Sequence, residues 1–371
     1  MDEVVITGIG FFSALGNLAQ TWQRMVQGES AIMPRQPFLS LPAYPLAMIE
    51  DRPHCLDRLA TKIITQALHS SELTPPLPEL AIAIGSSRGF QSHWEARISD
   101  QTQEGLWLEH LPHHLASLAA QITGATGMVT AMSAACTTGL HTLAYGYDLI
   151  KFGHYDRVLV GAVECPVTPL TLATFDQIGA LATTGCYPFD RDREGLVLGE
   201  GGALFILESL TAAQHRQAPI YGRLLGYGLT CDAYHPTAPE PTGKMARHGI
   251  KQCLQRSGLT PSHIDLIHSH GTSTQLNDQL EFNLISDLFP HRPPVIATKG
   301  YTGHTLGASG TISVALTLKM MEQKTVIANA GLTNPAFDLN LPMATENQPL
   351  HHSLVLGFGF GGQNAAIALG L

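Results

Sequence analysis

The sequence predicts an α/β fold made of two similar halves. Short apolar segments alternate with helix-like segments along the chain, which is the arrangement that layered α/β folds require. The apolar segments fall into two series with a duplicated order, and residues 211–218 form a polar helix or link between them. A chain of 371 residues that is 44% hydrophobic and 14% charged can bury the core of one large unit or of two tightly joined halves.

The predicted strands are the short apolar segments of these two series. The first series comprises residues 4–9, 80–84, 128–132, 158–162 and 203–207. The second series comprises residues 220–228, 264–267, 295–298, 354–356 and 365–369. The sequence shows no short-period repeat and no low-complexity linker. We therefore predict an N-terminal half over residues 1–215 and a C-terminal half over residues 216–371.

Cys136 lies where a strand-like stretch of small residues gives way to a helix-like one, within residues 130–139. A helix start presents free N–H groups and partial positive charge, which favour a thiolate and nucleophilic chemistry. A small cysteine buried in the core is the structural alternative for the same pattern. Cys136 is therefore a candidate nucleophile that needs support from other parts of the chain.

Two downstream segments place a histidine directly after a predicted strand. His270 lies in a polar, glycine-containing turn, and His304 lies in a glycine-rich and threonine-rich turn that opens a small-residue helix. Open α/β sheets bind their ligands at such strand ends. Most of the chain's 18 histidines are expected to be surface or structural residues. One cysteine with these two histidines suits covalent acyl chemistry, in which imidazole N–H groups stabilise an oxyanion or enolate.

Taken together, these segments resemble the elongating β-ketoacyl-acyl carrier protein synthases of the thiolase-like superfamily. The resemblance runs nearly from end to end, through residues 5–10, the Cys136 segment, residues 188–201, residues 232–235, both histidine segments and residues 357–364. It implies the thiolase-like fold, in which duplicated α/β halves stack as five α-β-α-β-α layers. The N-terminal half then carries Cys136, and the C-terminal half carries His270, His304 and Lys299. It also implies a homodimer, or a heterodimer with a similar chain.

The resemblance implies the catalytic roles residue by residue. Cys136 receives an acyl group from a thioester on the phosphopantetheine arm of acyl carrier protein, so no prosthetic group is expected. His270 and His304 donate hydrogen bonds to the carbonyl of malonyl-carrier protein and stabilise the enolate that forms when carbon dioxide leaves. Lys299 supports the site electrostatically and pairs with Glu281.

Further residues are implied for the oxyanion hole and for substrate binding. The backbone N–H groups of Cys136 and Phe360 form the oxyanion hole, and the Phe360 side chain gates the acyl chain. Phe358 lies beside it in a glycine-flanked segment whose backbone moves easily. The remaining substrate contacts are Thr272 and Thr274 with the phosphopantetheine arm, and Phe175 with the acyl chain. An ordinary hydroxyl-rich turn and a core phenylalanine are the structural alternatives for these last positions.

The chain departs from the family pattern at positions next to the predicted site. His268-Ser269 replaces the usual Asn-Ala, Gly300-Tyr301 replaces Ser-Met, and Leu356-Gly357 replaces Asn-Ser. The chain is also shorter than typical members between residues 28 and 80 and around residues 101–111. We expect these differences to affect acyl-chain length and carrier docking.

Sequence features separate this chain from enzymes with related activities. A thiolase normally carries a second catalytic cysteine in its C-terminal glycine loop, and residues 357–364 contain none. An initiating ketosynthase uses Cys-His-Asn, which the His304 turn disfavours. A chain-length-factor-like partner subunit with little activity of its own loses the nucleophile, which this chain retains. Primary fatty-acid elongation and a specialised polyketide or aryl-polyene pathway both remain open.

Composition excludes several other classes of protein. A formal net charge of −9 disfavours general nucleic-acid binding. The six cysteines include no C-x-x-C pair and no metal-ligand spacing, so reduced thiols and no metal site are expected. The N-terminal residues lack the basic and apolar regions of a signal peptide, and no apolar run approaches the roughly 20 residues that span a bilayer. We therefore expect a cytoplasmic protein without membrane association.

Overall fold

The computed structural model describes residues 2–99 and 107–371, and within them eleven strands form one mixed sheet. The sheet order is β11-β10-β14-β15-β9-β1-β8-β7-β5-β6, with β2 (Gly16–Asn17) paired to β1 at one side. Every predicted strand is confirmed as a member of this sheet, as β1 (Val4–Ser13), β5 (Ala81–Gly85), β6 (Val129–Met132), β7 (Arg157–Glu164), β8 (Gly201–Ser209), β9 (Gly222–Cys231), β10 (Leu266–His268), β11 (Val295–Ile296), β14 (His352–Gly359) and β15 (Gln363–Gly370).

The two halves of the sheet repeat one topology. From the middle outwards, the first half reads β1, β8, β7, β5 and β6, and the second half reads β9, β15, β14, β10 and β11. Strands of the same rank in chain order therefore occupy the same place in each half. Antiparallel pairing of Val4, Val5 and Ile6 with Leu224, Arg223 and Gly222 joins the halves into one sheet, which the sequence analysis did not predict.

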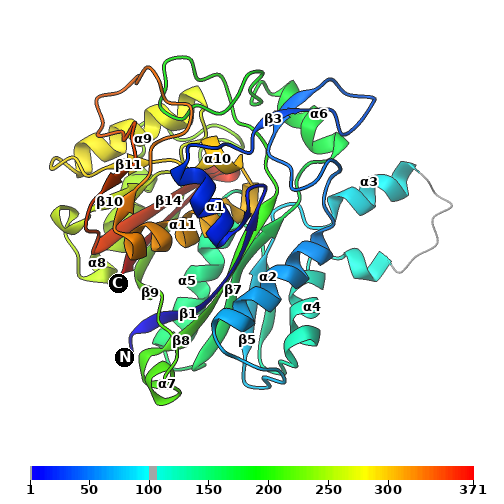
Figure 1. Cartoon of the computed structure of the whole chain (residues 1–371), viewed down its shortest axis with the longest axis vertical. Coiled ribbons are helices and arrows are strands. Elements are labelled where there is room, and N and C mark those ends of the chain that lie inside the picture. The colour runs from blue at the N-terminus through cyan, green and yellow to red at the C-terminus, as the bar shows by residue number, and fades with distance from the viewer. Residues whose placement is uncertain (1, 100–106) are drawn as a thin grey trace.

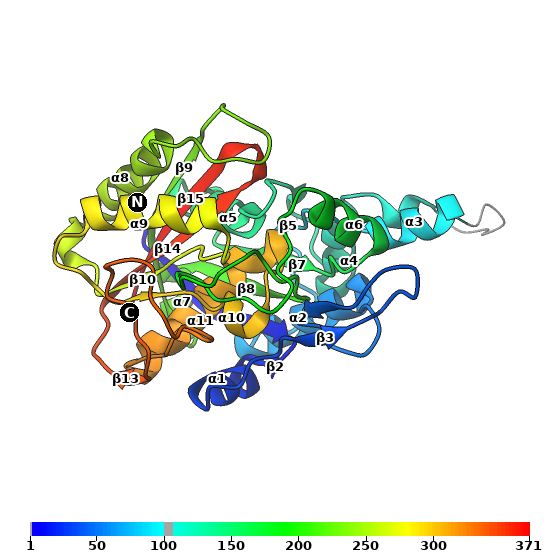
Figure 2. The ribbon, with the colours of Figure 1, turned by 90° about the horizontal axis from the view of Figure 1, so that it is seen from above.

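The helices complete the five expected layers (Figures 1 and 2). Two central helices, α5 (Thr138–Lys151) and α11 (Ser309–Gln323), lie between the halves, because α5 packs against β5 and β7 on one side and β9 and β15 on the other. The outer face of the first half carries α2 (Leu56–Ser70) and α4 (His114–Thr123). The outer face of the second half carries α8 (Lys244–Ser257) and α9 (Gln275–Leu288). The α-β-α-β-α arrangement is thus confirmed.

The central helices begin close to each other. A Cβ atom on Gly139 in α5 would lie 2.6 Å from a methyl group of Thr311, and one on Gly310 in α11 would lie 2.5 Å from Leu140. Glycine at these positions therefore allows the two N-terminal ends to touch. Nearly all of α11 is buried, which explains why its sequence is small or apolar on every face. This contact brings the segments before α5 and α11 together.

The remaining elements are short and lie around the sheet. The predicted polar helix or link at 211–218 is the short helix α7 (Leu210–His215). Two antiparallel ribbons were not predicted, β3 (Met33–Arg35) with β4 (Tyr44–Leu46) and β12 (Thr325–Val326) with β13 (Glu346–Asn347). The other helical elements are α1 (Leu18–Val26), α3 (Gln91–Ser99), η1 (Trp107–His110), α6 (Pro169–Gln177), η2 (Pro261–His263), α10 (Lys299–Thr302), η3 (Leu306–Ala308) and η4 (Phe360–Gly362).

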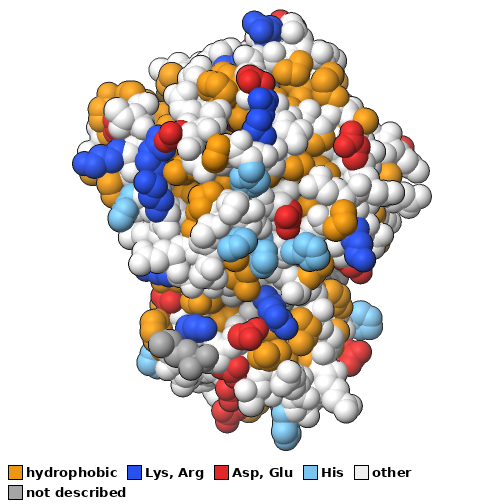
Figure 3. Space-filling model, turned by 90° about the vertical axis from the view of Figure 1, so that its left-hand side faces the viewer, with side chains coloured by type: hydrophobic (Ala, Val, Ile, Leu, Met, Phe, Trp, Pro, Cys, Tyr) orange, Lys and Arg blue, Asp and Glu red, His pale blue; other side chains and the backbone are white. Residues whose placement is uncertain are grey.

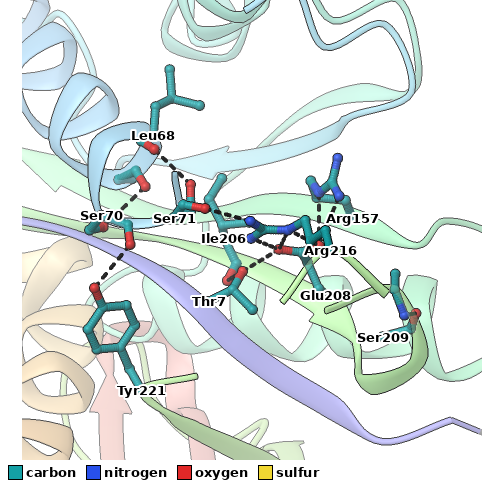
Figure 4. A network of polar contacts seen from close by, with 12 residues as sticks. Thr7, Leu68, Ser70, Ser71, Arg157, Ile206, Glu208, Ser209, Arg216 and Tyr221 are labelled. Carbon is teal, nitrogen blue, oxygen red and sulfur yellow. Dashed lines mark hydrogen bonds and ion pairs between the residues drawn. The ribbon is translucent and has the colours of Figure 1, made fainter. Parts of the chain in front are cut away.

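A buried carboxylate ties the first half together at the start of α7 (Figure 4). Glu208 in β8 is fully buried, and it accepts hydrogen bonds from Thr7 Oγ1 at 2.5 Å, from Arg157 Nη2 at 2.9 Å and from Arg216. Burial by itself raises the pKa of this carboxyl group, but the hydrogen bonds from Arg216, Thr7 and Arg157 hold the pKa of Glu208 below its ordinary value. Glu208 therefore links β1, β7 and α7 as a charged group.

Two observations bear on the expected surroundings of the protein. Within residues 2–99 and 107–371, every helix is too short or too polar to cross a bilayer. On the face shown in Figure 3, Lys and Arg side chains are interspersed with Asp and Glu side chains instead of forming one basic patch. This mixed surface agrees with the negative net charge of the chain.

Candidate active site

Cys136 lies in a strained turn directly before α5. Its neighbour Ala135 has φ of +48°, a left-handed conformation that costs a residue with a side chain about 1–3 kcal/mol. The Ala134 N–H donates to Thr138 Oγ1 at 2.8 Å, and Thr137 Oγ1 donates to the Ala134 carbonyl at 2.7 Å, so the turn is held from both sides. The predicted position of the thiol before a helix N-terminus is confirmed.

Most of the predicted site residues line one cavity of ≈ 320 Å³. The cavity lies where loops after the strands of both halves meet, as expected for an open α/β sheet. Its lining brings together eight of the predicted residues, Cys136, Phe175, His270, Thr272, Thr274, His304, Phe358 and Phe360. Lys299 and Glu281 lie outside this lining. Both contact the backbone of His270, Lys299 at the carbonyl group and Glu281 at the N–H group.

The two histidines converge inside the cavity. Their ring centroids are 5.2 Å apart, and both side chains are almost fully buried. Burial lowers the pKa of His270 and of His304 well below the ordinary value, and the charge of Lys299 lowers both further. Both rings are therefore neutral imidazoles, each with one N–H group available for donation.

Hydrogen bonds at Nδ1 determine which ring nitrogen carries the proton. Lys299 Nζ lies 3.4 Å from Nδ1 of His270, and because an ammonium can only donate, the ring proton of His270 is on Nε2. Nδ1 of His304 lies 2.7 Å from the hydroxyl oxygen of Ser309. When Ser309 donates in this pair, His304 also carries its proton on Nε2. Ser309 belongs to the segment that the sequence analysis singled out, but its contact with His304 was not predicted.

The expected pairing of Lys299 with Glu281 is not a direct contact. Lys299 Nζ donates to the backbone carbonyl of His270, and no ion pair of Lys299 occurs among residues 2–99 and 107–371, although the charges of Lys299 and Glu281 act on each other. The Glu281 carboxylate accepts hydrogen bonds from the backbone N–H groups of His270 and Gly271, both at 2.6 Å. Burial lowers the pKa of Lys299, and burial raises the pKa of Glu281. Both residues thus act on the backbone of the His270 turn, and they influence each other only through their charges.

The expectation of a thiolate at Cys136 is also corrected. Burial raises the pKa of the Cys136 thiol to about 11, although Lys299, the Phe360 backbone N–H and Arg88 each act to lower it. Loss of hydration in this cavity therefore outweighs these three contributions. Cys136 is therefore a neutral thiol at pH 7.

Phe360 makes two contacts, one with its backbone and one with its ring. Its backbone N–H hydrogen-bonds the Cys136 sulfur, and its ring stacks on Phe175 with centroids 5.8 Å apart and an interplanar angle of 16°. A Cβ atom on Gly359 would lie 3.1 Å from the backbone nitrogen of Cys136, so the segment passes directly over the thiol turn. Phe358 makes an edge contact with the His270 ring at 6.1 Å.

The two threonines lie side by side in the cavity wall. Thr272 Oγ1 and Thr274 Oγ1 are 2.9 Å apart and hydrogen-bond each other. They follow Gly271, which has φ of +47° and where an added Cβ atom would lie only 2.4 Å from the Ala297 side chain, so the turn requires glycine. The turn therefore presents two hydroxyl groups next to His270.

His268, one of the departures from the family pattern, is a structural residue. It is fully buried, with Nδ1 2.9 Å from Thr317 Oγ1 and Nε2 3.0 Å from Thr298 Oγ1. Burial lowers the pKa of His268 to about 3, so the ring is neutral. His268 thereby ties β10 to α11 and to the residue that precedes Lys299.

Metal ligation is not evident in the part of the chain that the structure describes. There, no group of three or more His, Cys, Asp or Glu side chains is arranged to hold an ion. Glu164, whose charge acts on Cys136, accepts hydrogen bonds from donors of the chain that include Ser86 Oγ, Ser87 Oγ and the backbone N–H of Gly307. The cavity contains a thiol and two imidazoles, and its lining also includes Glu194 and Asp232.

Family models match most of the chain. The model of the beta-ketoacyl synthase N-terminal domain matches residues 52–213, and the model of the C-terminal domain matches residues 221–333. The chain is 30% identical to 3-oxoacyl-[acyl-carrier-protein] synthase 2 of Mycobacterium leprae, with 99% of this chain and 96% of the relative covered. It is 31% identical to the protein of the same name in Synechocystis sp., with 99% and 97% covered.

Solved structures with similar folds are ketosynthases. One is a type II polyketide ketosynthase in complex with its acyl carrier protein and bound to a hexaketide; it has a TM-score of 0.90 and 26% identity, with 100% of this chain and 99% of that chain covered. Another is the ishigamide ketosynthase/chain length factor, with a TM-score of 0.92, 26% identity and the same coverage.

Proposed function

The chain belongs to the β-ketoacyl synthase family of condensing enzymes, and we propose that it extends an acyl chain by decarboxylative Claisen condensation with malonyl-acyl carrier protein. The observation that carries this proposal is the convergence of one thiol and two neutral imidazoles in a single cavity. The enzyme is accordingly a 3-oxoacyl-acyl carrier protein synthase, an acyltransferase of fatty acid or polyketide elongation.

The first half-reaction transfers the acyl group to Cys136. The sulfur attacks the acyl-carrier thioester, a new carbon–sulfur bond forms, and the carrier thiol leaves with the proton that Cys136 gives up. The backbone N–H groups of Cys136 and Phe360 stabilise the tetrahedral oxyanion. Thr272 and Thr274 hydrogen-bond the phosphopantetheine arm, while Phe175 and Phe360 contact the acyl chain.

The second half-reaction uses the histidines. His270 and His304 donate Nε2–H to the malonyl thioester carbonyl, where negative charge develops as carbon dioxide leaves. The enolate carbon attacks the acyl-Cys136 carbonyl, and collapse of the tetrahedral intermediate breaks the carbon–sulfur bond to Cys136. The released sulfur takes up one proton, which its high pKa favours. The product is a 3-oxoacyl chain on the carrier, two carbons longer than the primer.

Neutral histidines suit this second step. Neutral N–H donors aimed at the thioester oxygen bind it more strongly as charge develops there, and they place no full positive charge where it would also stabilise the malonyl carboxylate of the ground state. Burial keeps both rings neutral by lowering their pKa values, and the charge of Lys299 lowers these values further; Lys299 also holds the backbone carbonyl of His270. Lys299 and Glu281 are therefore positioning residues in this proposal.

The assembly and location of the enzyme are part of the same proposal. Acyl carrier protein delivers both substrates, and no bound prosthetic group is required. The enzyme acts in the cytoplasm as a homodimer or as a heterodimer with a similar chain, without nucleic acid or membrane partners. The division into halves at residues 215 and 216 separates Cys136 from the two histidines, so catalysis requires both halves.

A specialised pathway is the second candidate. The similarity to a polyketide ketosynthase bound to a hexaketide supports a polyketide or aryl-polyene role, in which a chain-length-factor-like subunit would be the partner. The retained thiol supports a catalytic chain rather than the inactive subunit of such a pair.

The proposal is tested by incubating the protein with malonyl-carrier protein and a series of acyl-carrier primers. We expect mass spectrometry to detect acyl-Cys136 and 3-oxoacyl-carrier products, together with release of one carbon dioxide per product. Decarboxylation without any condensed product would instead support the chain-length-factor role. Absence of both acylation and decarboxylation would overturn the proposed function.

A further inference from the structure

Arg88 is half-buried and lies near the acyl-accepting thiol. Its guanidinium group has no role in the mechanism above. It lies between β5 and α3, and its backbone N–H donates to Glu164 Oε1 at 3.0 Å. The guanidinium carbon lies 5.5 Å from the centroid of the Phe175 ring. Within residues 2–99 and 107–371 the Arg88 side chain has no hydrogen bond and no ion pair.

An arginine without such partners has N–H donors that are free to bind an acceptor. The guanidinium carries five N–H donors in a planar fork and cannot lose its charge. Arg193, by comparison, donates Nη1–H to the Asp190 carbonyl, and its Nε lies 3.6 Å from Asp278 Oδ2. A cation that is partly removed from water without an acceptor is costly, and a bound acceptor would recover that cost.

Phe175 connects Arg88 to the cavity. The Phe175 ring lines the cavity beside Cys136, and it contacts Arg88 as well as the gate residue Phe360. The charge of Arg88 also reaches the thiol, because it acts to lower the pKa of Cys136. The guanidinium therefore lies next to Phe175, one side chain away from the lining of the cavity that contains Cys136.

The surroundings of Phe175 are also polar in part. Thr171 lies one helical turn before Phe175 on α6. Gln91 Nε2 donates hydrogen bonds to Thr171 Oγ1 at 3.1 Å and to Thr168 Oγ1 at 3.2 Å. A fully reduced alkyl chain placed here would bury Arg88 further and offer it no acceptor. The keto oxygens of an oxygenated acyl chain would accept hydrogen bonds from the N–H groups of Arg88.

We propose that Arg88 is a specificity-determining residue, which donates hydrogen bonds to keto oxygens of the acyl group carried by Cys136 and thereby selects oxygenated over fully reduced acyl chains. This inference rests on the proposed function, since it requires acylation of Cys136. It narrows the substrate class to partially elongated chains that keep at least one carbonyl group beyond the thioester.

The experiment measures acylation of Cys136 by mass spectrometry with hexanoyl-, 3-oxohexanoyl- and 5-oxohexanoyl-pantetheine, which have equal chain length. We expect the wild-type protein to react at least about tenfold faster with one of the oxo chains than with the hexanoyl chain. Arg88→Met removes the charge and the donors while keeping the length of the side chain, and the rate ratio should fall to about one. Arg88→Lys keeps the charge and should retain part of the preference.

A matched control is Arg256→Met, because Arg256 also lies over an aromatic ring, 4.3 Å from the centroid of Tyr227, but on α8. Its rate ratio should equal that of the wild type. The inference would be overturned if Arg88→Met kept the wild-type ratio of oxo-chain to hexanoyl-chain rates. It would also be overturned if this variant lost rate equally with all three chains, because that result places the effect at the thiol. Wild-type acylation with all three chains at one rate overturns this inference alone. Failure of every chain to acylate Cys136 overturns the proposed function and this inference with it.

Discussion

His270 and His304 meet edge to face, with their ring planes at 83° and their centroids 5.2 Å apart. They come from different segments of the second half, the turn after β10 and the turn between α10 and η3. Rings in this arrangement can direct two N–H groups at one oxygen atom. The pair is therefore suited to hold a single carbonyl oxygen as it acquires charge.

Replacing the nucleophile should separate the two half-reactions. In Cys136→Ala no acyl-enzyme can form, so condensation should be abolished, while His270 and His304 still address the malonyl carbonyl. Slow decarboxylation of malonyl-carrier protein should therefore persist. Carbon dioxide release and mass-detected products can be measured on the same samples. Loss of decarboxylation together with condensation would contradict the separate roles of thiol and histidines.

Replacing one enolate donor should have the opposite effect. His304→Ala should retain acylation of Cys136 but slow decarboxylation about a hundredfold, because one donor to a developing enolate contributes roughly 3 kcal/mol. The exposed His351 offers a matched control, and His351→Ala should decarboxylate at the wild-type rate. If His304→Ala also does so, His304 is not an enolate donor.

The gate can be tested without removing the oxyanion donor. Phe360→Ala keeps the backbone N–H that contacts Cys136 but removes the ring that stacks on Phe175. We expect the preferred acyl length to shift, measured as acylation rates across a ladder of saturated acyl-carrier proteins. Phe152→Ala, at an exposed position after α5, serves as the control and should keep the wild-type profile. Identical profiles for both variants would exclude a gating role.

The protonation state of the thiol predicts a pH profile. With a pKa of about 11, the thiolate fraction of Cys136 is about 10⁻⁴ at pH 7 and rises about tenfold with each pH unit. Alkylation of Cys136 by iodoacetamide, followed by peptide mass spectrometry, should therefore accelerate about tenfold per unit between pH 7 and 10. Cys136→Ala identifies alkylation at other thiols such as the exposed Cys231. A plateau below pH 9 would show that the thiol ionises more easily than its burial implies.

The Glu208 network should contribute to stability. Glu208→Gln keeps the shape but removes the charge that Arg157 and Arg216 face, and we expect a loss of about 3 kcal/mol in urea unfolding at pH 7. Glu346→Gln, at an exposed position in β13, should change little. Because the folded pKa of Glu208 lies below that of the unfolded chain, its contribution is present above about pH 4.3 and is lost at lower pH. The difference between wild type and variant should therefore shrink below pH 4.

Local sequence patterns predicted much of this protein. Strands such as β5, β7, β8 and β14 were found because a short apolar run reports burial on both faces, and helices cover both faces of the sheet there. β6 and β9 are only partly buried, and they were found from their short apolar runs alone. Cys136, His270 and His304 were found because each follows a strand in a turn with a distinct composition. The five-layer order followed from the resemblance carried by these motifs.

Other features depend on contacts between segments that are far apart in the sequence, and only the tertiary structure decided them. The β1–β9 pairing, the partners of Lys299 and Glu281, and the contact of Arg88 with Phe175 each join positions whose local sequences do not refer to each other. The protonation state of Cys136 is the clearest case. Its place before a helix predicted a lowered pKa from the local sequence, but loss of hydration where the two halves meet raises the pKa of Cys136 more than Lys299, the Phe360 backbone N–H and Arg88 lower it.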